Sequence, residues 1–434
     1  MVASTEGRDL WWTLGTDCHE ERHRFVLVDE QCERQGEWWV ANRRDTIEDA
    51  VAKIVLNLPE GKRLRVATES DRNLAWVVAQ VASQLGLEIW HVPPKAQDRY
   101  REAEGLPRKD DEIDAFLSAR MVWLGLRGCR VIYDPQPEER ALCRLTRLRH
   151  SQVSRRRAVQ AQLRSLFLEV APEVLGSDWE GPVFAGQGMR AVLRRWPAFR
   201  GLERAHSKTV EKVLRANSRY GDRCIDMVKP LKEMARRIHL SAEEREVIEM
   251  TVSMALDELE LLDKVIAKLS REITHRVEAH PVGKKLLAMP GVGTITAATD
   301  IAEILPVARH VSEGKAATYA GLTPLSRRSG KAAADGKGSS KLARGTNKHA
   351  LRTNYLSAVA ALQASAIDAA YHRKQKTRHQ GHPKPHVKAT IALARQRFKV
   401  KYKLMTSDAV YDKEKLIASH LERLERDQTR SSGA

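Results

Sequence analysis

The chain has 434 residues, of which 42% are hydrophobic and 30% charged, a composition typical of a soluble protein with two or three domains. It contains no run of eighteen apolar residues, which excludes a transmembrane helix, and its first residues lack the pattern of a secretory signal. Its five scattered cysteines never form a CxxC pair, which argues against a disulfide framework or a cysteine-rich zinc site and favours a reducing cytoplasm.

The first 135 residues predict a sheet with helices on its faces. Three strands joined by short polar turns form an antiparallel meander. A helix that starts at a capping Thr46 follows, and strands then alternate with helices, which is typical of a mixed α/β sheet. The tryptophans, most of which lie in these elements, are expected in the core. The predicted strands are 10–17, 22–31, 36–44, 63–70 and 88–94, and the predicted helices are 46–58, 73–86 and 110–125.

Residues 136–282 predict long helices. One covers 142–170, and another opens with the capping box of Ser241 and Glu244. Along this second helix, apolar residues recur with heptad spacing at Ile248, Val252, Ala255, Leu259, Leu262, Ile266, Leu269 and Ile273. Such spacing predicts a coiled coil or a long antiparallel hairpin, and a plain helical bundle fits it equally well. Residues 283–405 predict a third, mainly helical region, followed by a charged tail at 406–434.

The net charge of +18 is concentrated in one segment of that third region. Between Lys315 and Lys403 there are 20 basic residues and only two acidic ones, Asp335 and Asp368. Because a concentrated basic segment on an otherwise balanced protein attracts polyanions, nucleic acid is the expected partner. A tail that merely keeps the protein in solution is the alternative, but the segment also contains an apolar helical run at 351–371.

Four carboxylates are placed where an α/β sheet collects ligands. Asp17 and Glu69 each end a predicted strand, while Asp111 and Asp114 share one face at the start of a helix. Asp110 could replace Asp111, because it lies four residues before Asp114. If the four converge, their repulsion requires a cation, for which Mg²⁺ is the natural candidate, and two such ions can assist phosphodiester transfer. Taken singly, each carboxylate could instead cap a turn, end a solvated strand or lie in an ordinary acidic first turn.

Ser329 is a candidate nucleophile. It lies in a glycine-rich loop and is flanked by Arg327, Arg328 and Lys331, whose positive charge favours the alkoxide and attracts a phosphate. A merely polar linker serine is the alternative. Three competing serines lie close by in sequence: Ser326, Ser339 and Ser340.

Several residues are predicted to contact phosphates without reading sequence. The PGVG turn offers Gly291 and Gly293, whose backbone can approach a phosphate closely, although a simple helix–helix turn explains it equally well. No zinc site is expected at His372, His379, His382 and His386, which lie among lysines and prolines without a cysteine. The basic residues predicted to bind nucleic acid are Arg327, Arg328, Lys331, Lys337, Lys341, Arg344, Lys348 and Arg352.

The order of these motifs resembles a known family. Asp17, Glu69, Asp111 and Asp114, followed by PGVG, YAGLTP, RRSG and a helix with GTN and ALR, are similar to the DEDD transposases of the insertion-sequence 110 family. These are bridge-RNA-guided recombinases, and the DNA invertase Piv is a relative. The resemblance covers residues 10–125 and 283–405, while the middle matches only in being helical.

The resemblance implies a RuvC-like, ribonuclease-H-type domain at 1–135, which holds Mg²⁺ with the four carboxylates. It further implies a helical or coiled-coil dimerisation region at 136–282 and a transposase domain at 283–405, whose Ser329 becomes covalently linked to DNA. Donor and target DNA would be chosen by a noncoding bridge RNA, in a bacterial cytoplasm. The active site would combine domains from two protomers of a homodimer, and dimers would pair into tetramers. The alternatives are a RuvC-like nuclease without a covalent intermediate and a nonenzymatic nucleic-acid-binding protein.

Overall fold

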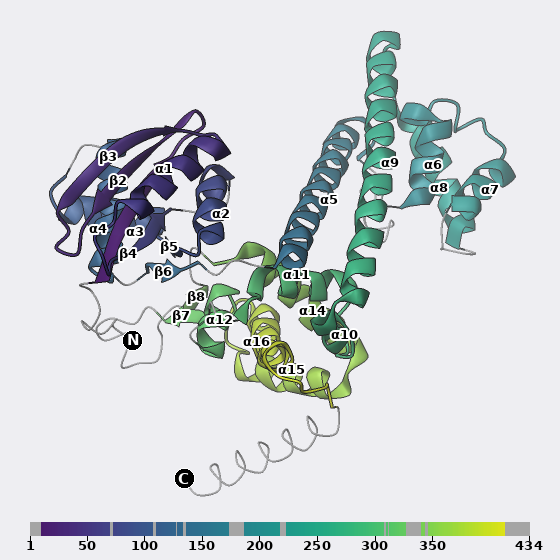
Figure 1. Cartoon of the computed structure of the whole chain (residues 1–434). Helices are drawn as coiled ribbons and strands as arrows, with labels where there is room; N and C mark the ends of the chain where they lie inside the picture. The colour runs from purple at the N-terminus through teal and green to yellow at the C-terminus, as the bar shows by residue number, and fades with distance from the viewer. Residues whose placement is uncertain are drawn as a thin grey trace, which may run out of the picture. The chain divides into compact units, whose positions relative to one another are not determined.

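The computed structural model divides into two compact units (Figure 1). The first comprises Met1–Gln136 with Leu305–Val311, and the second comprises Pro137–Ile304 with Ser312–Ala434. None of the described helices combines the length and apolar character needed to cross a bilayer. The structure describes residues 10–69, 73–106, 110–126, 128–132, 136–172, 186–217, 223–307, 310, 312–326, 340–342 and 346–412.

The first unit is built on a six-stranded mixed sheet in the order β3-β2-β1-β4-β5-β6. The first three strands pair antiparallel, β1 pairs parallel with β4 and β4 with β5, and β6 returns antiparallel. The predicted meander and mixed sheet are therefore confirmed, whereas the short β6 was not predicted. The strands are β1 (Trp11–Cys18), β2 (Arg22–Val28), β3 (Arg34–Ala41), β4 (Arg63–Thr68), β5 (Glu88–His91) and β6 (Arg130–Val131).

Helices cover both faces of this sheet. A core that includes Leu14, Phe25 and Ile47 joins the strands to α1 (Arg44–Leu56) and α2 (Trp76–Gln84), which follows the short 3-10 turn η2 (Asn73–Ala75). On the other face, Val26 and Val28 pack against α4 (Asp111–Trp123), and Ala67 packs near α3 (Pro94–Ala103) and α4.

Two helices differ from the sequence prediction. Helix α1 begins at Arg44 rather than at a capping Thr46, so Thr46 lies inside the first turn, where its amide donates to the Asp45 carboxylate at 2.8 Å. Helix α3 was not predicted, because its sequence is mostly polar and only Gln97 is buried. Its few apolar residues, Ala96, Tyr100 and Ala103, do have helical spacing, and the first two pack against the core cluster that contains Ala67.

Helix α4 lies directly against strand β1 at Gly15. A Cβ added there would lie 1.9 Å from the carbonyl oxygen of Ala115 and 2.9 Å from the amide nitrogen of Ala119. Both alanines are fully buried. Their small side chains on the helix, and the lack of a side chain at Gly15 on the strand, permit the close approach. The start of α4 is thereby fixed beside the end of β1.

We expect Gly15→Ala to destabilise the first unit by about 3 kcal/mol, at the upper end of the usual cost of overpacking. The methyl group has no space beside the Ala115 carbonyl, so α4 must move away from β1. Urea unfolding measures the effect, with Gly381→Ala as the control, since a Cβ at Gly381 meets no heavy atom within 4 Å. Equal unfolding midpoints for the two variants would contradict the tight contact.

The second unit begins with a long antiparallel helix pair, α5 (Pro137–Val170) and α9 (Ala242–Ala279). Two ion pairs show that the helices are antiparallel. Glu138 near the start of α5 pairs with Arg276 near the end of α9, and Arg155 further along α5 pairs with Glu258 nearer the middle of α9. The smaller helices share a core with one end of this pair (Figure 1). They are α6 (Gln187–Arg195), the 3-10 turn η4 (Pro197–Phe199), α7 (Ser207–Asn217) and α8 (Arg223–Arg237).

Helix α9 follows its predicted pattern closely. Ser241 and Glu244 form the predicted capping box. Of the heptad positions, the buried ones are Val252, Leu259, Leu262, Ile266 and Ile273, and the helix pairs with α5 as a long antiparallel hairpin. Ile248, Ala255 and Leu269 are only partly buried, whereas Leu256 and Val277 are buried although the heptads omit them.

The rest of the second unit is mainly helical. The predicted apolar run 351–371 divides at Ser365, whose hydroxyl caps the second helix by accepting from the Asp368 amide. The second unit contains both the helical region and the C-terminal region, so the boundary near residue 283 stays a prediction. The elements are α10 (Pro281–Leu287), α11 (Thr294–Ile304), α12 (Glu313–Tyr319), β7 (Pro324–Ser326), β8 (Ser340–Leu342), α14 (Lys348–Ala364), α15 (Ala366–Arg378) and α16 (Pro385–Thr406).

Buried charges tie these helices together. The Lys401 ammonium on α16 donates to Asp300 on α11 and to Asn354 on α14, each at 2.8 Å. All three residues are nearly inaccessible to solvent. Burial lowers the pKa of Lys401, and Asp300 acts against that shift. Because an uncompensated buried charge is costly, this arrangement fixes how the three helices meet.

Candidate metal centre and nucleic-acid interface

The parallel pairing of β1 with β4 brings two of the predicted carboxylates to one face of the sheet. Gly15 is paired with Ala67, and the Thr16 hydroxyl donates to the Ala67 carbonyl at 3.1 Å. Two residues further along the chain from this pair lie Asp17, still on β1, and Glu69, which directly follows the end of β4, both on the same face by alternation. Asp17 is buried, whereas Glu69 is partly exposed.

Helix α4 brings Asp111 to the same place. Asp110 caps the helix, its carboxylate accepting from the Glu112 amide at 2.9 Å. His19 lies between Asp17 and Asp111, with its Nε2 atom 3.2 Å from Asp17 Oδ2 and 3.4 Å from Asp111 Oδ1. The structure therefore places Asp111, rather than Asp110, beside Asp17.

Asp114 has a cationic partner that the sequence did not reveal. Its carboxylate accepts from the guanidinium of Arg101 on α3, and its backbone carbonyl accepts from Gln97. Both Asp114 and Arg101 have little exposed surface. Since α3 is mostly polar and was not predicted, sequence reasoning did not place Arg101 at this site.

The electrostatics of the site favour a cation. Burial raises the pKa of Asp17, the charges of Asp111 and Asp114 raise it further, and His19 acts in the opposite direction. Within the described part of the chain, the ligand atoms of Asp17, His19 and Asp111 lie within 4.8 Å of one another, and Glu69 and Asp114 are not in this group. Two carboxylates and an imidazole suit a divalent ion, and the crowded negative charge supplies a reason to bind one.

His19 is the residue of this site that sequence reasoning missed. It follows Asp17 by two positions, the spacing that places side chains on the same side of an extended chain, and this was the available signal. Its amide donates to His23 Nδ1 at 3.2 Å, which holds the turn after β1 in place.

Much of the predicted basic site lies outside the described residues. This holds for Ser329 and for Arg327, Arg328, Lys331, Lys337, Arg344 and Ser339. Lys341 lies on β8, which pairs antiparallel with β7 so that Ser326 is opposite Ser340. Lys348 and Arg352 lie on α14.

The asparagine of the GTN motif anchors the start of α14. Asn347 Oδ1 accepts from the His349 and Ala350 amides at 3.0 Å, while its Nδ2 donates to Glu303 at 2.6 Å. Glu303 is fully buried and also accepts two hydrogen bonds from Arg147 on α5. The motif therefore connects α14 to α11 and α5, a structural role that its sequence did not reveal.

The PGVG turn joins α10 to α11. Gly291 has a φ of +73°, and a Cβ there would lie 2.7 Å from the Ala361 amide nitrogen, so close packing on α14 requires this glycine. The Ser357 hydroxyl donates to the Gly291 carbonyl at 2.8 Å, and Arg397 donates to the Pro290 carbonyl. A Cβ at Gly293 would meet nothing within 4 Å. Packing explains Gly291, and phosphate contact by the turn stays a prediction.

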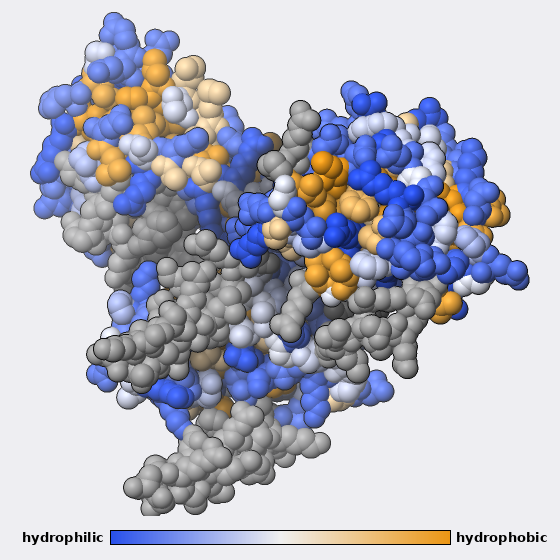
Figure 2. Space-filling model, turned by 90° about the vertical axis from the view of Figure 1, so that its left-hand side faces the viewer, coloured by the Kyte–Doolittle hydropathy of each residue, from blue (hydrophilic) through white to orange (hydrophobic). Residues whose placement is uncertain are grey.

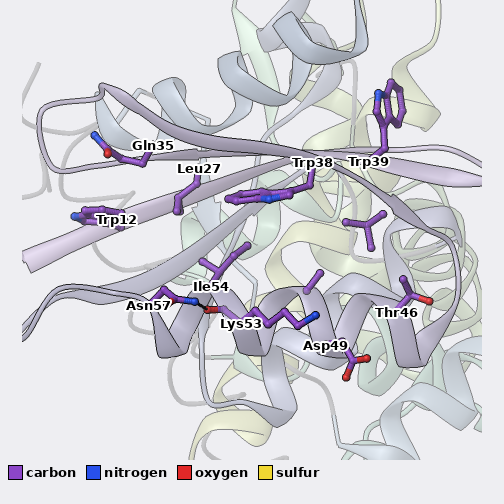
Figure 3. A pocket seen from close by; sticks show the side chains of 12 residues that line it. Trp12, Leu27, Gln35, Trp38, Trp39, Thr46, Asp49, Lys53, Ile54 and Asn57 are labelled. Carbon is purple, nitrogen blue, oxygen red and sulfur yellow. Dashed lines mark hydrogen bonds between the residues drawn. The ribbon is translucent and has the colours of Figure 1, made fainter.

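The opposite face of the sheet carries a pocket of about 670 Å³ between the first three strands and α1 (Figure 3). Trp38 extends along it and Trp39 points away. These residues are 39% and 43% exposed, so the expectation that tryptophans lie in the core is wrong for them. Trp39 instead lies under the Arg22 guanidinium, 4.0 Å from the ring centre. Elsewhere, hydrophobic residues gather in separate patches on a largely hydrophilic face (Figure 2).

We expect saturating Mg²⁺ or Mn²⁺ to raise the Tm of the wild-type protein and to leave that of Asp17→Asn unchanged, because ligand binding stabilises the folded state. Without metal, Asp17→Asn is expected to be at least as stable as wild type. The raised pKa of Asp17 means that its ionised form lowers stability at neutral pH, a cost that disappears as the pH falls through that pKa. Differential scanning calorimetry measures both effects.

Asp49→Asn is the matched control for this experiment, because Asp49 is an exposed carboxylate on α1. It should keep the metal-induced rise in Tm. An equal rise in Asp17→Asn would rule Asp17 out as a metal ligand.

Comparison with known proteins gives two matching family models. Residues 14–172 match the DEDD transposase model of IS110, and residues 283–373 match the transposase family IS116/IS110/IS902. The first match covers β1 to α5, including all four carboxylates, and the second covers α10 to α15.

Individual relatives come from bacterial insertion elements. An uncharacterized 43.6 kDa protein of IS110 from Streptomyces coelicolor is 27% identical over 54% of this chain, and the match covers 55% of that relative. An uncharacterized 42 kDa protein of IS900 from Mycobacterium paratuberculosis is 30% identical over 37% of the chain and 38% of its own length. The mini-circle protein assigned to IS117 of S. coelicolor as its transposase is 24% identical over 83% of the chain and 87% of its own length.

The chain thus spans about half of the first relative and less of the second. The two family models account for both the acidic sheet and the C-terminal helices. By these matches, the chain belongs to the IS110 family of DEDD transposases.

Proposed function

We propose that this protein is a DNA transposase that cuts and rejoins DNA through Ser329, assisted by Mg²⁺ at Asp17, Glu69, Asp111 and Asp114. The observation that carries the proposal is the meeting of Asp17 and Asp111 around His19, from elements that are distant in sequence. Family membership and the relative assigned as the IS117 transposase support the reaction class. The bacterial cytoplasm is the proposed location.

The acidic residues have separate tasks in this proposal. Asp17 and Asp111 would hold the metal with Glu69 beside them, and a bound divalent ion would supply Lewis-acid stabilisation of charge developing on the phosphate and leaving oxygen. His19 contacts both carboxylates and so orients them. Arg101 holds the carboxylate of Asp114 in place from α3.

The chemical step requires no external oxidant or reductant. The Ser329 oxygen loses its proton and forms a bond to a DNA phosphorus while the bond from that phosphorus to a deoxyribose oxygen breaks. The released deoxyribose oxygen takes up a proton and becomes a hydroxyl, so the proton count balances. Attack by a hydroxyl of the new strand reverses the step and frees the serine. Neighbouring basic residues would stabilise the charge on the phosphate.

A noncoding bridge RNA is the proposed guide to donor and target DNA. If base pairing with the RNA selects the DNA sequence, the protein needs only to bind phosphates and to recognise the shape of the helix. The excess of basic over acidic residues between Lys315 and Lys403 supports this, since phosphate contacts dominate such binding.

Helix α9 supports a homodimer. Val247, Met250, Met254 and Leu261 recur on it at spacings of three, four and seven residues and are 57%, 57%, 65% and 62% exposed. A large exposed apolar stripe on a long helix is typical of a helix–helix interface, and a second copy of the chain is the proposed partner. Dimers would pair into tetramers, and each active site would combine acidic and serine domains from different protomers.

The second candidate is a RuvC-like nuclease in which water attacks the phosphate and Ser329 only contacts it. One observation favours it: within the described part of the chain, the residues grouped at the acidic site all belong to the first unit. A nonenzymatic nucleic-acid-binding protein is the remaining alternative.

Incubation with Mg²⁺, the RNA and end-labelled donor DNA is expected to give a labelled protein–DNA adduct on a denaturing gel. The adduct should vanish in Ser329→Ala, which lacks the nucleophile, and in Asp17→Asn, which lacks a metal ligand. Ser326→Ala and Ser340→Ala are the matched controls and should retain it. Cleaved DNA without any adduct, still dependent on Asp17, would identify the hydrolytic nuclease instead.

We expect the double variant Met254→Asp/Leu261→Asp to sediment as a monomer at concentrations where the wild-type protein is a dimer. Four charges in the assembled apolar interface, two from each copy, would be desolvated without partners. The control is Leu56→Asp, which changes a leucine on α1 that lies outside the stripe and is more exposed, at 83%. Sedimentation velocity measures the outcome, and a dimeric double variant would place the interface elsewhere.

A further inference from the structure

A cluster of cationic side chains lies where α5 meets α14. The Arg352 guanidinium on α14 lies 3.1 Å from His150 Nδ1 on α5. The His150 and His349 rings meet edge to face, with centres 4.9 Å apart. Arg149 and Arg157 on α5 act electrostatically on the same group. We call these five residues, from two regions distant in sequence, the α5–α14 cluster.

The cluster differs in its partners from three other arginines of α5. Arg147 is paired with Glu303, Arg155 with Glu258 and Arg156 with Asp263. Within the part of the chain that the structure describes, no carboxylate pairs with Arg149, Arg157 or Arg352. Arg149 instead donates to the neutral hydroxyl of Ser270 at 2.8 Å.

The charges in the cluster oppose one another. Burial lowers the pKa of Arg149, and the charges of Arg156 and Arg352 lower it further. Burial also lowers the pKa of Arg352, with Arg157 adding to the shift, and His150 responds in the same direction to burial and to its cationic neighbours. All three pKa values are lowered, as expected for cationic groups that lack a counterion. An anion bound here would relieve the repulsion between them.

The shape of the cluster favours an extended anion. Arg149 and Arg157 are two helical turns apart, about 12 Å at 1.5 Å per residue, which exceeds the reach of a single phosphate. Arg157 is exposed to solvent, and so is Lys348, which directly precedes His349 in the chain. Guanidinium groups match phosphate oxygens with paired hydrogen bonds, and several along one line suit a chain of phosphates.

We propose that the α5–α14 cluster binds the phosphodiester backbone of a nucleic acid, with Arg149, Arg157 and Arg352 as phosphate ligands. The site rests on the proposed function and deepens it, because it gives α5 a nucleic-acid contact beyond its role in the helix pair. DNA and RNA share the backbone chemistry, so the experiment tests both.

The test compares Arg157→Gln/Arg352→Gln with wild type by fluorescence anisotropy, using a DNA duplex and an RNA duplex of the same sequence over a range of salt concentrations. Each phosphate contact contributes about 0.9 to the slope of log K against log salt for DNA and a smaller share for single strands. We expect the slope to fall by about two and the affinity to fall at low salt. If the variant loses affinity for only one of the two duplexes, the cluster binds that nucleic acid. If it loses affinity for both, the cluster binds the backbone of DNA and RNA alike.

Two further variants separate charge from structure. Arg155→Gln removes an exposed α5 arginine that is paired with Glu258, and it should leave the slope unchanged. Arg157→Lys/Arg352→Lys keeps the charges and should restore the slope, which a merely structural role would not do. A double Gln variant that binds both duplexes like Arg155→Gln overturns the cluster as a site. Failure of the wild type to bind either duplex overturns the proposed function as well.

Discussion

The absence of a side chain at Gly15 is the constraint on which the acidic site depends. It lets α4 lie against β1, and this contact, with the packing of Val26 and Val28 on α4, brings Asp111 and Asp114 to the end of the strand that carries Asp17. The carboxylates themselves oppose the arrangement, since Asp111 and Asp114 both raise the pKa of Asp17. Packing therefore has to hold together groups that electrostatics would separate, which is the usual condition of a preorganised metal site.

The second unit shows the same contrast between paired and crowded charge. In its core, Lys401 is compensated by Asp300, so these ions fix helix positions and need no further ligand. Where α5 meets α14, Arg149 and Arg352 are close to other cations, and burial adds to the cost. In a structural ion pair, opposite charges compensate each other. Where packing holds like charges together, as in the proposed α5–α14 cluster, a ligand of opposite charge would compensate them.

Local patterns predicted the local structure well. Strand alternation predicted the meander, and the capping box predicted the start of α9. The order of the acidic residues predicted that four carboxylates converge, and of these Asp17 and Asp111 meet around His19, whereas Glu69 and Asp114 are not in that group. Spacing alone allowed both Asp110 and Asp111. Two contacts separate them: the Asp110 carboxylate accepts from the Glu112 amide, whereas Asp111 lies beside His19. Arg101 was not predictable, because α3 has almost no apolar face and its approach to Asp114 depends on tertiary packing.

Helix α5 makes contacts that the sequence of the middle region did not predict. One of its faces packs on α9. Other faces carry Arg147, which reaches the Glu303–Asn347 anchor of α14, and His150, which contacts Arg352. These contacts join residues far apart in the chain, so no local pattern encodes them. A helix expected to act only in assembly thus also fixes the start of α14, the helix that follows the serine loop in the chain.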